Sequence, residues 1–546
     1  MVQHAARTND RGMLAERGAL IPGVGGADRE RVGRSGDAGR WAEVLFVVGT
    51  CLYLYVKLFT FRSIPILLGG DQIFFWMDAK RLLLGERIYL DFFQFTPPGT
   101  DVIYLAFFKL FGPRIWVPNL IVLILGVLFG WVCFRISISF LKTSQAILAA
   151  SLFTVFIYGT LLNATHHLFS ELAVLGAVAV LMRGKSWTRV ALAGMLLGLA
   201  TFFTQTRGPI AALAIAAYFT WDQLRVRGSW FDYFRRLALL FSSLIFSWLI
   251  LSSYFIATVG LGQIWKWQVD YVLHQKVAEG IGFGLPHALS WSGLSGLSGL
   301  AGDLSILFVC LMLPVIYGVT LWLCWRERGA ASSASAASSA IVGRLALLAF
   351  VGIATALEMT PSLTWFRLYC VAAPAVLLFV WAVGRVPTHQ RLISNLLWIG
   401  LCCFTLGQTW SLHRHQFVIL DAPAGTVAAY PEQAEKLSWI AQRTKPGDYF
   451  FQAGWPGVYL PLDLNNPVYA ESLSPFNTTI PEIVERSIGQ LESRQVRYIL
   501  WAPFLNSPMP PGHPEVYHLT PLRDYMNKNY QKVWTFPDGD EVWERK

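Results

Sequence analysis

Long apolar segments separated by short polar or basic stretches repeat along the chain as far as residue 412. Many windows reach the ~18–20 apolar residues that a helix needs to cross a bilayer. The pattern predicts a polytopic α-helical membrane protein with about eleven spanning helices. Their expected positions are residues 41–61, 116–138, 144–161, 168–183, 190–205, 209–222, 237–260, 303–325, 341–358, 368–385 and 392–412.

The regions on either side of this membrane domain (41–412) have a different character. Residues 1–40 are rich in Arg, Gly and Ala and are expected to be disordered. Residues 413–546 alternate helical patterns with short apolar strands, which predicts a small α/β domain. We expect helices at 432–443, 481–493 and 519–529, and strands at 448–452, 496–501, 532–536 and 541–543.

One long segment between the first two spans, residues 62–115, is too polar and too interrupted to cross. Its apolar run at 98–111 contains Asp101 and Lys109, and runs this short are more often interfacial or re-entrant than spanning. If it does not cross, every Lys/Arg cluster of the short loops falls on the side of the N-terminus, as the positive-inside rule requires. The clusters are Arg135/Lys142, Arg183/Lys185/Arg189, Arg225/Arg227/Arg235/Arg236, Arg326/Arg328/Arg344 and Arg385/Arg391.

This topology gives the chain a location and an orientation. The N-terminus is expected in the cytoplasm, and the loop 62–115 and the C-terminal domain outside a bacterial inner membrane. The composition agrees with a membrane location, because 54% of residues are hydrophobic and only 14% are charged, against roughly 25% in soluble proteins. The net charge of +10 is spread over short loops and forms no nucleic-acid-binding patch. The seven cysteines show neither a disulfide framework nor zinc-site spacing.

Asp71 is the first candidate for chemistry. It follows Gly69–Gly70 and precedes a helix-like run, 72–84, which we expect to be amphipathic and to lie at the membrane surface. The carboxylate could cap this helix. It could also act as a general base that accepts a proton from an attacking hydroxyl group, and the two roles are compatible.

Other acidic residues share this loop, and most are expected to be solvated or to cap turns. Asp78 and Asp91 are nevertheless candidates for contact with substrate.

A second group of polar residues, His166, His167 and Glu171, follows the next outer turn. On a helix His167 and Glu171 share a face. Together with Asp71 they could hold a divalent metal such as Mg, Mn or Zn. The alternative is a histidine pair at the interface, with Glu171 hydrogen-bonded within the bundle. An ionisable residue inside a span favours a functional role.

Two arginines, Arg207 and Arg367, lie on the outer side and break the positive-inside pattern. A phosphate group is a natural partner for a guanidinium at this depth. The alternative for either residue is a pair with a nearby carboxylate such as Glu358.

Several short motifs resemble those of the GT-C-fold glycosyltransferases, among them protein O-mannosyltransferases, the lipid A aminoarabinose transferase and lipopolysaccharide galacturonosyltransferases. The first outer loop carries the similarity in AKRLLLGERIYLD (79–91), TPPG (96–99) and FKLFG (108–112). QTRG (205–208), PGDYFFQAG (446–454), and Arg367 with Tyr369 and Pro374 resemble later motifs of that family.

The resemblance implies a polyprenyl-phosphate-sugar donor, a hydroxyl-bearing glycan, lipid or protein acceptor, and an active site at the outer face. It implies Asp71 as the principal catalytic carboxylate, Glu171 as the second, and a substrate-binding role for Tyr369. Gln72 stands where the family commonly has Glu. The alternative function is a transporter or flippase of lipid or glycan precursors, which should show an internal repeat and charges near mid-membrane. We find neither.

Overall fold

The computed structural model describes residues 32–546 except for 227, 277–295, 327–335, 360–364, 387, 415, 475–478 and 507–517. The disorder expected for residues 1–31 therefore lies outside the described residues. The first helix, α1, begins at Val32, so residues 32–40 are helical and not disordered as predicted.

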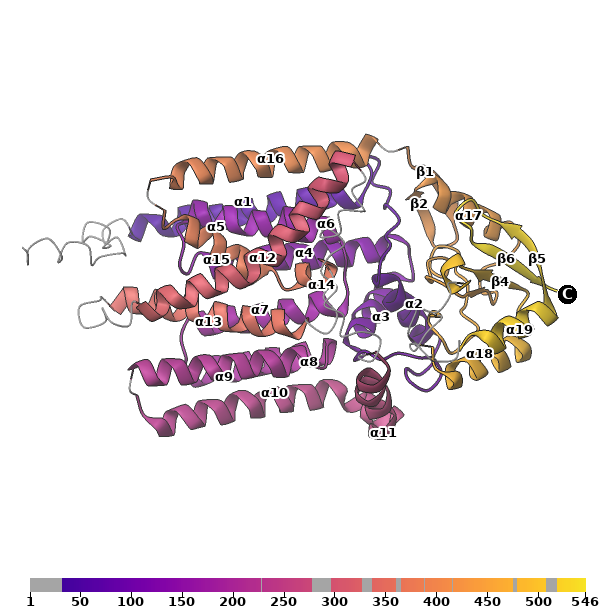
Figure 1. The fold of residues 1–546 in the computed structure, drawn as a ribbon, viewed down its shortest axis with the longest axis horizontal. Helices are drawn as coiled ribbons and strands as arrows, with labels where there is room; N and C mark the ends of the chain where they lie inside the picture. Colours follow the sequence, from indigo (N-terminus) through magenta and orange to yellow (C-terminus); the bar gives the residue numbers. More distant parts are fainter. Residues whose placement is uncertain are drawn as a thin grey trace, which may run out of the picture.

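All the predicted spans lie on helices of one bundle (Figure 1). Within the described ranges, six helices are long and apolar enough to cross a membrane, and four further apolar helices are shorter. The bundle comprises α1 (Val32–Leu58), α4 (Trp116–Ser137), α5 (Thr143–Leu152) with η2 (Phe153–Tyr158) and α6 (Gly159–Leu161), α7 (His166–Met182), α8 (Trp187–Phe203), α9 (Arg207–Val226), α10 (Trp230–Val259), α12 (Gly296–Arg326), α13 (Ala336–Glu358), α14 (Trp365–Cys370), α15 (Ala373–Val383) and α16 (Gln390–Arg414).

Loops that carry basic clusters meet at one end of this bundle. Arg344 in the third turn of α13 donates to the carbonyl of Met182 at the end of α7 across 3.2 Å, and also to the carbonyl of Ser139 after α4. Arg225 near the end of α9 donates to the hydroxyl of Ser339 across 2.6 Å. The loops therefore lie together, as they must if residues 98–111 add no crossing.

The opposite end of the bundle carries two helices of the first long loop, α2 (Gln72–Leu83) and α3 (Gly99–Phe111), which lie between the bundle and the C-terminal domain (Figure 1). Nearly all of α2 is buried, so the prediction of a helix resting on the membrane surface was wrong. The C-terminal domain covers its polar face. Lys80 pairs with Asp463 at 2.7 Å, and Arg81 donates to the carbonyl of Val468 across 2.9 Å.

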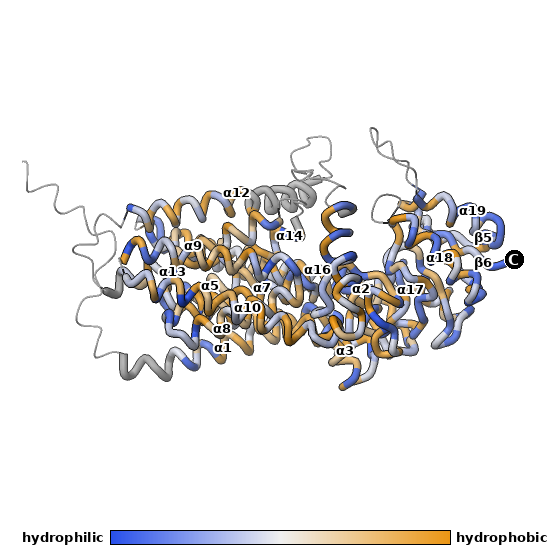
Figure 2. The backbone as a smooth tube through the Cα atoms, turned by 90° about the horizontal axis from the view of Figure 1, so that it is seen from below, coloured by the Kyte–Doolittle hydropathy of each residue, from blue (hydrophilic) through white to orange (hydrophobic). Residues whose placement is uncertain are grey.

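The C-terminal domain is a small α/β unit, as predicted, and carries more hydrophilic residues than the bundle (Figure 2). Its four-stranded sheet has the order β3-β4-β6-β5, in which only β3 and β4 are parallel. A hairpin that we did not predict precedes it. The elements are β1 (Val418–Ala422), β2 (Gly425–Ala429), α17 (Pro431–Ala441), β3 (Phe451–Gln452), α18 (Pro481–Ser493), β4 (Tyr498–Trp501), η7 (Pro503–Asn506), α19 (Thr520–Asn529), β5 (Tyr530–Thr535) and β6 (Glu541–Arg545).

The segment after α10 packs against both domains. It forms the short helices α11 (Leu261–Trp265), η3 (Lys266–Asp270) and η4 (Val272–Lys276). Trp267 and Tyr271 are buried and make edge contacts with Phe93 of the first loop, with ring centroids 5.1 Å apart in both pairs. These aromatic contacts join the bundle, the first loop and the C-terminal domain into one apolar core.

Candidate active site

Asp71 stands at the N-cap position of α2, but its side chain makes no capping hydrogen bond. It is half-buried. Gly70 directly before it has a φ of +76°, a conformation that glycine adopts without strain, and a Cβ there would lie 3.4 Å from the side chain of Asn163. The turn therefore brings the backbone directly before Asp71 close to Asn163 of the second outer loop.

Gln72 ties the first outer loop to the second. Its amide nitrogen donates to the carbonyls of Gly69 at 2.9 Å and Leu162 at 3.2 Å, and its amide oxygen accepts from the backbone N–H of Ala164 at 3.2 Å. A glutamate could not donate the first two bonds. Sequence reasoning treated Gln72 only as a departure from a family pattern and missed this positioning role, because its partner loop lies far away in the sequence.

The two histidines at the start of α7 face aromatic side chains from two other elements. Their own ring centroids are 4.0 Å apart. His166 lies 5.5 Å from Phe75 of α2, and His167 lies 6.2 Å from Phe366 of α14. The first turns of α2, α7 and α14 therefore converge at this end of the bundle.

Four predicted site residues lie within electrostatic reach of one residue, Cys370 at the end of α14. The charges of Arg207, Glu171, Asp71 and Arg367 all act on the thiol of Cys370, and the charge of Asp71 also acts on Arg367. These residues come from positions that are widely separated in the sequence, and the fold brings all four within electrostatic reach of Cys370.

Arg207 lies between two carboxylates and is wholly buried. It pairs with Glu171 at 2.9 Å and also with Glu358 at the end of α13. Thr206 donates to the same Glu358. This arrangement favours the alternative considered for Arg207, a carboxylate partner, over direct contact with a phosphate. It also gives Glu171 an ion-pair partner inside the bundle.

The metal site suggested for Asp71, His167 and Glu171 does not fit the structure. Among the described residues, no three His, Cys, Asp or Glu side chains are grouped as metal ligands. Glu171 is directed to Arg207 instead, and an arginine beside a carboxylate disfavours a cation there. We therefore assign no step to a metal.

Asp78 and Asp91 lie away from this convergence. The Asp91 carboxylate accepts from the backbone N–H of Arg87 at 2.8 Å and pairs with its side chain at 3.1 Å. Partial burial tends to raise the pKa of Asp91, but the interactions with Arg87 outweigh it and hold this pKa below its usual range. Asp91 thus caps a turn, as most of these acids were expected to do. Asp78 is wholly buried and faces the C-terminal domain, so the expectation that such acids are solvated is wrong for it.

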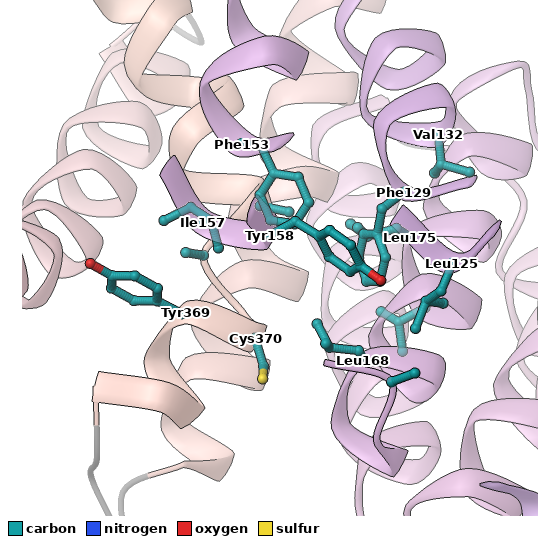
Figure 3. Close-up of a cluster of buried hydrophobic side chains, with 14 of the residues drawn as sticks. Leu125, Phe129, Val132, Phe153, Ile157, Tyr158, Leu168, Leu175, Tyr369 and Cys370 are labelled. Carbon is teal, nitrogen blue, oxygen red and sulfur yellow. The ribbon is translucent and has the colours of Figure 1, made fainter. Parts of the chain in front are cut away.

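Tyr369 is buried, and Figure 3 shows its hydroxyl directed away from the packed rings of Phe129, Phe153 and Tyr158. The same view shows Cys370 on the opposite side of the chain, toward Leu168 of α7. Successive residues of α14 thus point to different sides.

An aromatic residue of the C-terminal domain, Trp455, reaches the first turn of α2. Its ring centroid lies 5.3 Å from that of Phe74, one helical turn after Asp71, and half of its surface remains exposed. Its neighbours Gly454 and Pro456 are buried. A loop whose neighbouring residues are buried therefore exposes a tryptophan beside the first turn of α2.

Comparisons with known proteins find similar solved structures. No protein-family model and no curated protein matches the sequence. Among solved structures, the chain is similar to the oligosaccharyltransferase of Archaeoglobus fulgidus, with 13% identity and a TM-score of 0.49 over 92% of this chain and 73% of that one.

Two further similar structures are those of ArnT from Cupriavidus metallidurans bound to undecaprenyl phosphate and of the arabinofuranosyltransferase AftD from Mycobacteria. ArnT has 14% identity and a TM-score of 0.44 over 92% of this chain and 97% of that one. AftD has 15% identity and a TM-score of 0.46 over 92% of this chain and 41% of that one. All three are GT-C-fold membrane glycosyltransferases, the class that the sequence resembles. Since every TM-score is below 0.5, we argue substrate and mechanism from this chain's own residues.

Proposed function

We propose that this protein is a membrane glycosyltransferase that moves a sugar from a polyprenyl-phosphate donor to a hydroxyl group of an acceptor at the outer face of the membrane. The observation that carries the proposal is the pairing of a carboxylate that does not cap its helix, Asp71, with a guanidinium within electrostatic reach, Arg367. They lie at the end of the bundle opposite the basic loops.

In the proposed reaction the acceptor oxygen attacks the anomeric carbon while the bond from that carbon to the phosphate oxygen breaks. Asp71 accepts the proton of the acceptor hydroxyl. The phosphate leaves with the electron pair of the broken bond, and Arg367 stabilises its charge. A donor anchored in the bilayer brings its head group to a fixed depth, so positioning supplies much of the catalysis.

The Glu171–Arg207–Glu358 group has a supporting role in this proposal. Its guanidinium is already neutralised by carboxylates on two helices, α7 and α13. It joins these helices to the start of α9 beneath the site. We assign direct phosphate contact to Arg367 and positioning to Arg207.

The acceptor side of the proposed site is marked by Trp455. An exposed tryptophan offers a flat apolar surface and an N–H donor, which suits the face of a sugar ring. Because Trp455 contacts Phe74, a ring held there would lie one helical turn from Asp71.

The proposal is tested by comparing lipid extracts of cells that lack the protein with those of cells that express it again from a plasmid. A polyprenyl-phosphate sugar should accumulate in the deletion strain and be consumed on re-expression, as measured by mass spectrometry. An unchanged set of polyprenyl-phosphate sugars would contradict the proposal.

A further inference from the structure

Three carboxyl groups are buried together where the first loop meets the C-terminal domain. Asp78 on α2 and Asp101 in the first turn of α3 have no exposed surface, and Glu471 from the C-terminal domain is 6% exposed. The Asp78 carboxyl group lies within hydrogen-bonding reach of Glu471 and accepts a hydrogen bond from the amide of Gln94 at 3.1 Å. Among the described residues, one oxygen of Asp78 and one of Glu471 are buried with no other hydrogen-bond partner. The group lies outside the convergence of Asp71 and Arg367 and has no part in the proposed chemistry.

A hydrogen bond between two carboxyl groups requires a proton, because an ionised carboxylate can only accept. Within the described part of the chain, no cation forms an ion pair with Asp78 or Glu471. The charge of Arg81 acts on both Asp78 and Glu471, but its hydrogen bonds go to Glu86 at 2.6 Å and to backbone carbonyls. Two buried ionised carboxylates in contact would repel each other in a region of low dielectric.

The surroundings add further negative groups. Asp101 lies within electrostatic reach of Asp78 and Glu471, and among the described residues no other residue donates a hydrogen bond to its carboxyl oxygens. Glu86 acts on Asp78, and the neutral hydroxyl of Tyr89 lies within reach of all three acids. Protonation is thus the way in which this contact is satisfied.

We propose that Glu471 is a positioning residue, through which the C-terminal domain holds α2 by a carboxyl pair with Asp78 that shares one proton. Since α2 begins directly after Asp71, this contact fixes the position of the turn that carries Asp71, the proposed general base. The catalytic consequence rests on the proposed function, whereas the contact itself does not.

The contact has a definite pH dependence. Burial raises the pKa of Asp78 to about 7 and raises the pKa of Glu471 and Asp101 above the usual range. When the domains separate, these groups return to ordinary values near 4. The docked state therefore binds more protons, and its stabilisation is full below about pH 4 and is lost as the pH rises through about 7.

The test is hydrogen exchange in α2, corrected for intrinsic rates, in the full-length protein in detergent between pH 5 and pH 8.5. Wild-type α2 should lose protection by at least tenfold across this range. Asp78→Asn and Glu471→Gln carry an amide donor that needs no proton, so their protection should change at least fivefold less than that of the wild type, and the remaining change comes from Asp101 and the other acid. Glu485→Gln, an exposed residue on α18, is the matched control and should follow the wild type.

Activity separates this proposal from the proposed function. Sugar transfer by the wild type should fall above pH 7, and transfer by Glu471→Gln should not. Amide variants with the wild-type pH dependence of exchange would overturn the shared proton. If the amide variants show a reduced pH dependence of hydrogen exchange but Glu471→Gln transfers sugar with the wild-type pH profile, the positioning role is overturned. If the amide variants show a reduced pH dependence of exchange but the wild-type protein transfers no sugar, the Asp78–Glu471 contact is upheld and only the proposed function is overturned.

Discussion

The guanidinium of Arg207 donates a hydrogen bond to the carboxylate of Glu171 across 2.9 Å, and neither side chain has any surface exposed to solvent. Glu358 completes the group from a third helix. An ion pair that is buried in this way holds the helices in register only while both partners are present.

Glu171→Ala should destabilise the protein by about 3–5 kcal/mol, because removal of one partner leaves part of a buried charge without compensation. The double variant Glu171→Leu with Arg207→Leu should recover much of this loss, although Glu358 then lacks its own partner. Thermal unfolding in detergent measures both. A single variant as stable as the wild type would contradict the assigned pair.

Gln72→Ala should reduce sugar transfer by ~10²-fold, because a displacement of about 1 Å in a positioned group can cost that much. Stability should fall by only about 1–3 kcal/mol for the unsatisfied backbone groups. Gln72→Glu retains the acceptor for Ala164 but loses both donors, so it should also be impaired. Initial rates with matched expression levels measure the effect. Full activity in Gln72→Glu would show that the hydrogen bonds from Gln72 to the carbonyls of Gly69 and Leu162 do not position the site.

The apolar pattern was sufficient to predict the bundle and most of the C-terminal domain. Each spanning segment carries its own signal, and α18 begins and ends at the predicted residues. The hairpin β1–β2 was missed because Val418–Ala429 contains only two short strands around a turn.

The environment of the first loop could not be predicted in the same way. Asp78 looks like a solvated residue on a polar helical face, and only the C-terminal domain, which supplies Glu471, makes that face buried. Gln72 gave no local signal, because its role depends on a partner loop that the fold brings from far along the chain. Asp71 was found because its acidic side chain stands directly after a turn in an apolar region.

Trp455→Ala should raise the KM for the acceptor about fivefold, equivalent to the loss of on the order of 1 kcal/mol of aromatic contact. The kcat should change little, and Trp455→Phe should retain most of the affinity. The control is Trp534→Ala on β5, where the tryptophan is exposed to a similar degree. An equal effect of both alanine variants would show that Trp455 has no specific contact with the acceptor.

The orientation predicts different labelling of two exposed serines. In a background without native cysteines, Ser493→Cys on α18 should react with a membrane-impermeant maleimide in intact inner-membrane spheroplasts. Ser229→Cys, in the loop before α10, should react only after the membrane is permeabilised. The reverse pattern would place the proposed site in the cytoplasm.

The most direct measurement is sugar transfer by Asp71→Asn in membranes, with the donor identified in the lipid extracts and expression equal to the wild type. The loss of the proposed base should lower the rate by ~10²–10⁴-fold, and Asp91→Asn, which removes a turn cap, should retain activity. Transfer by Asp71→Asn at the wild-type rate would contradict the assignment of Asp71 as the catalytic carboxylate.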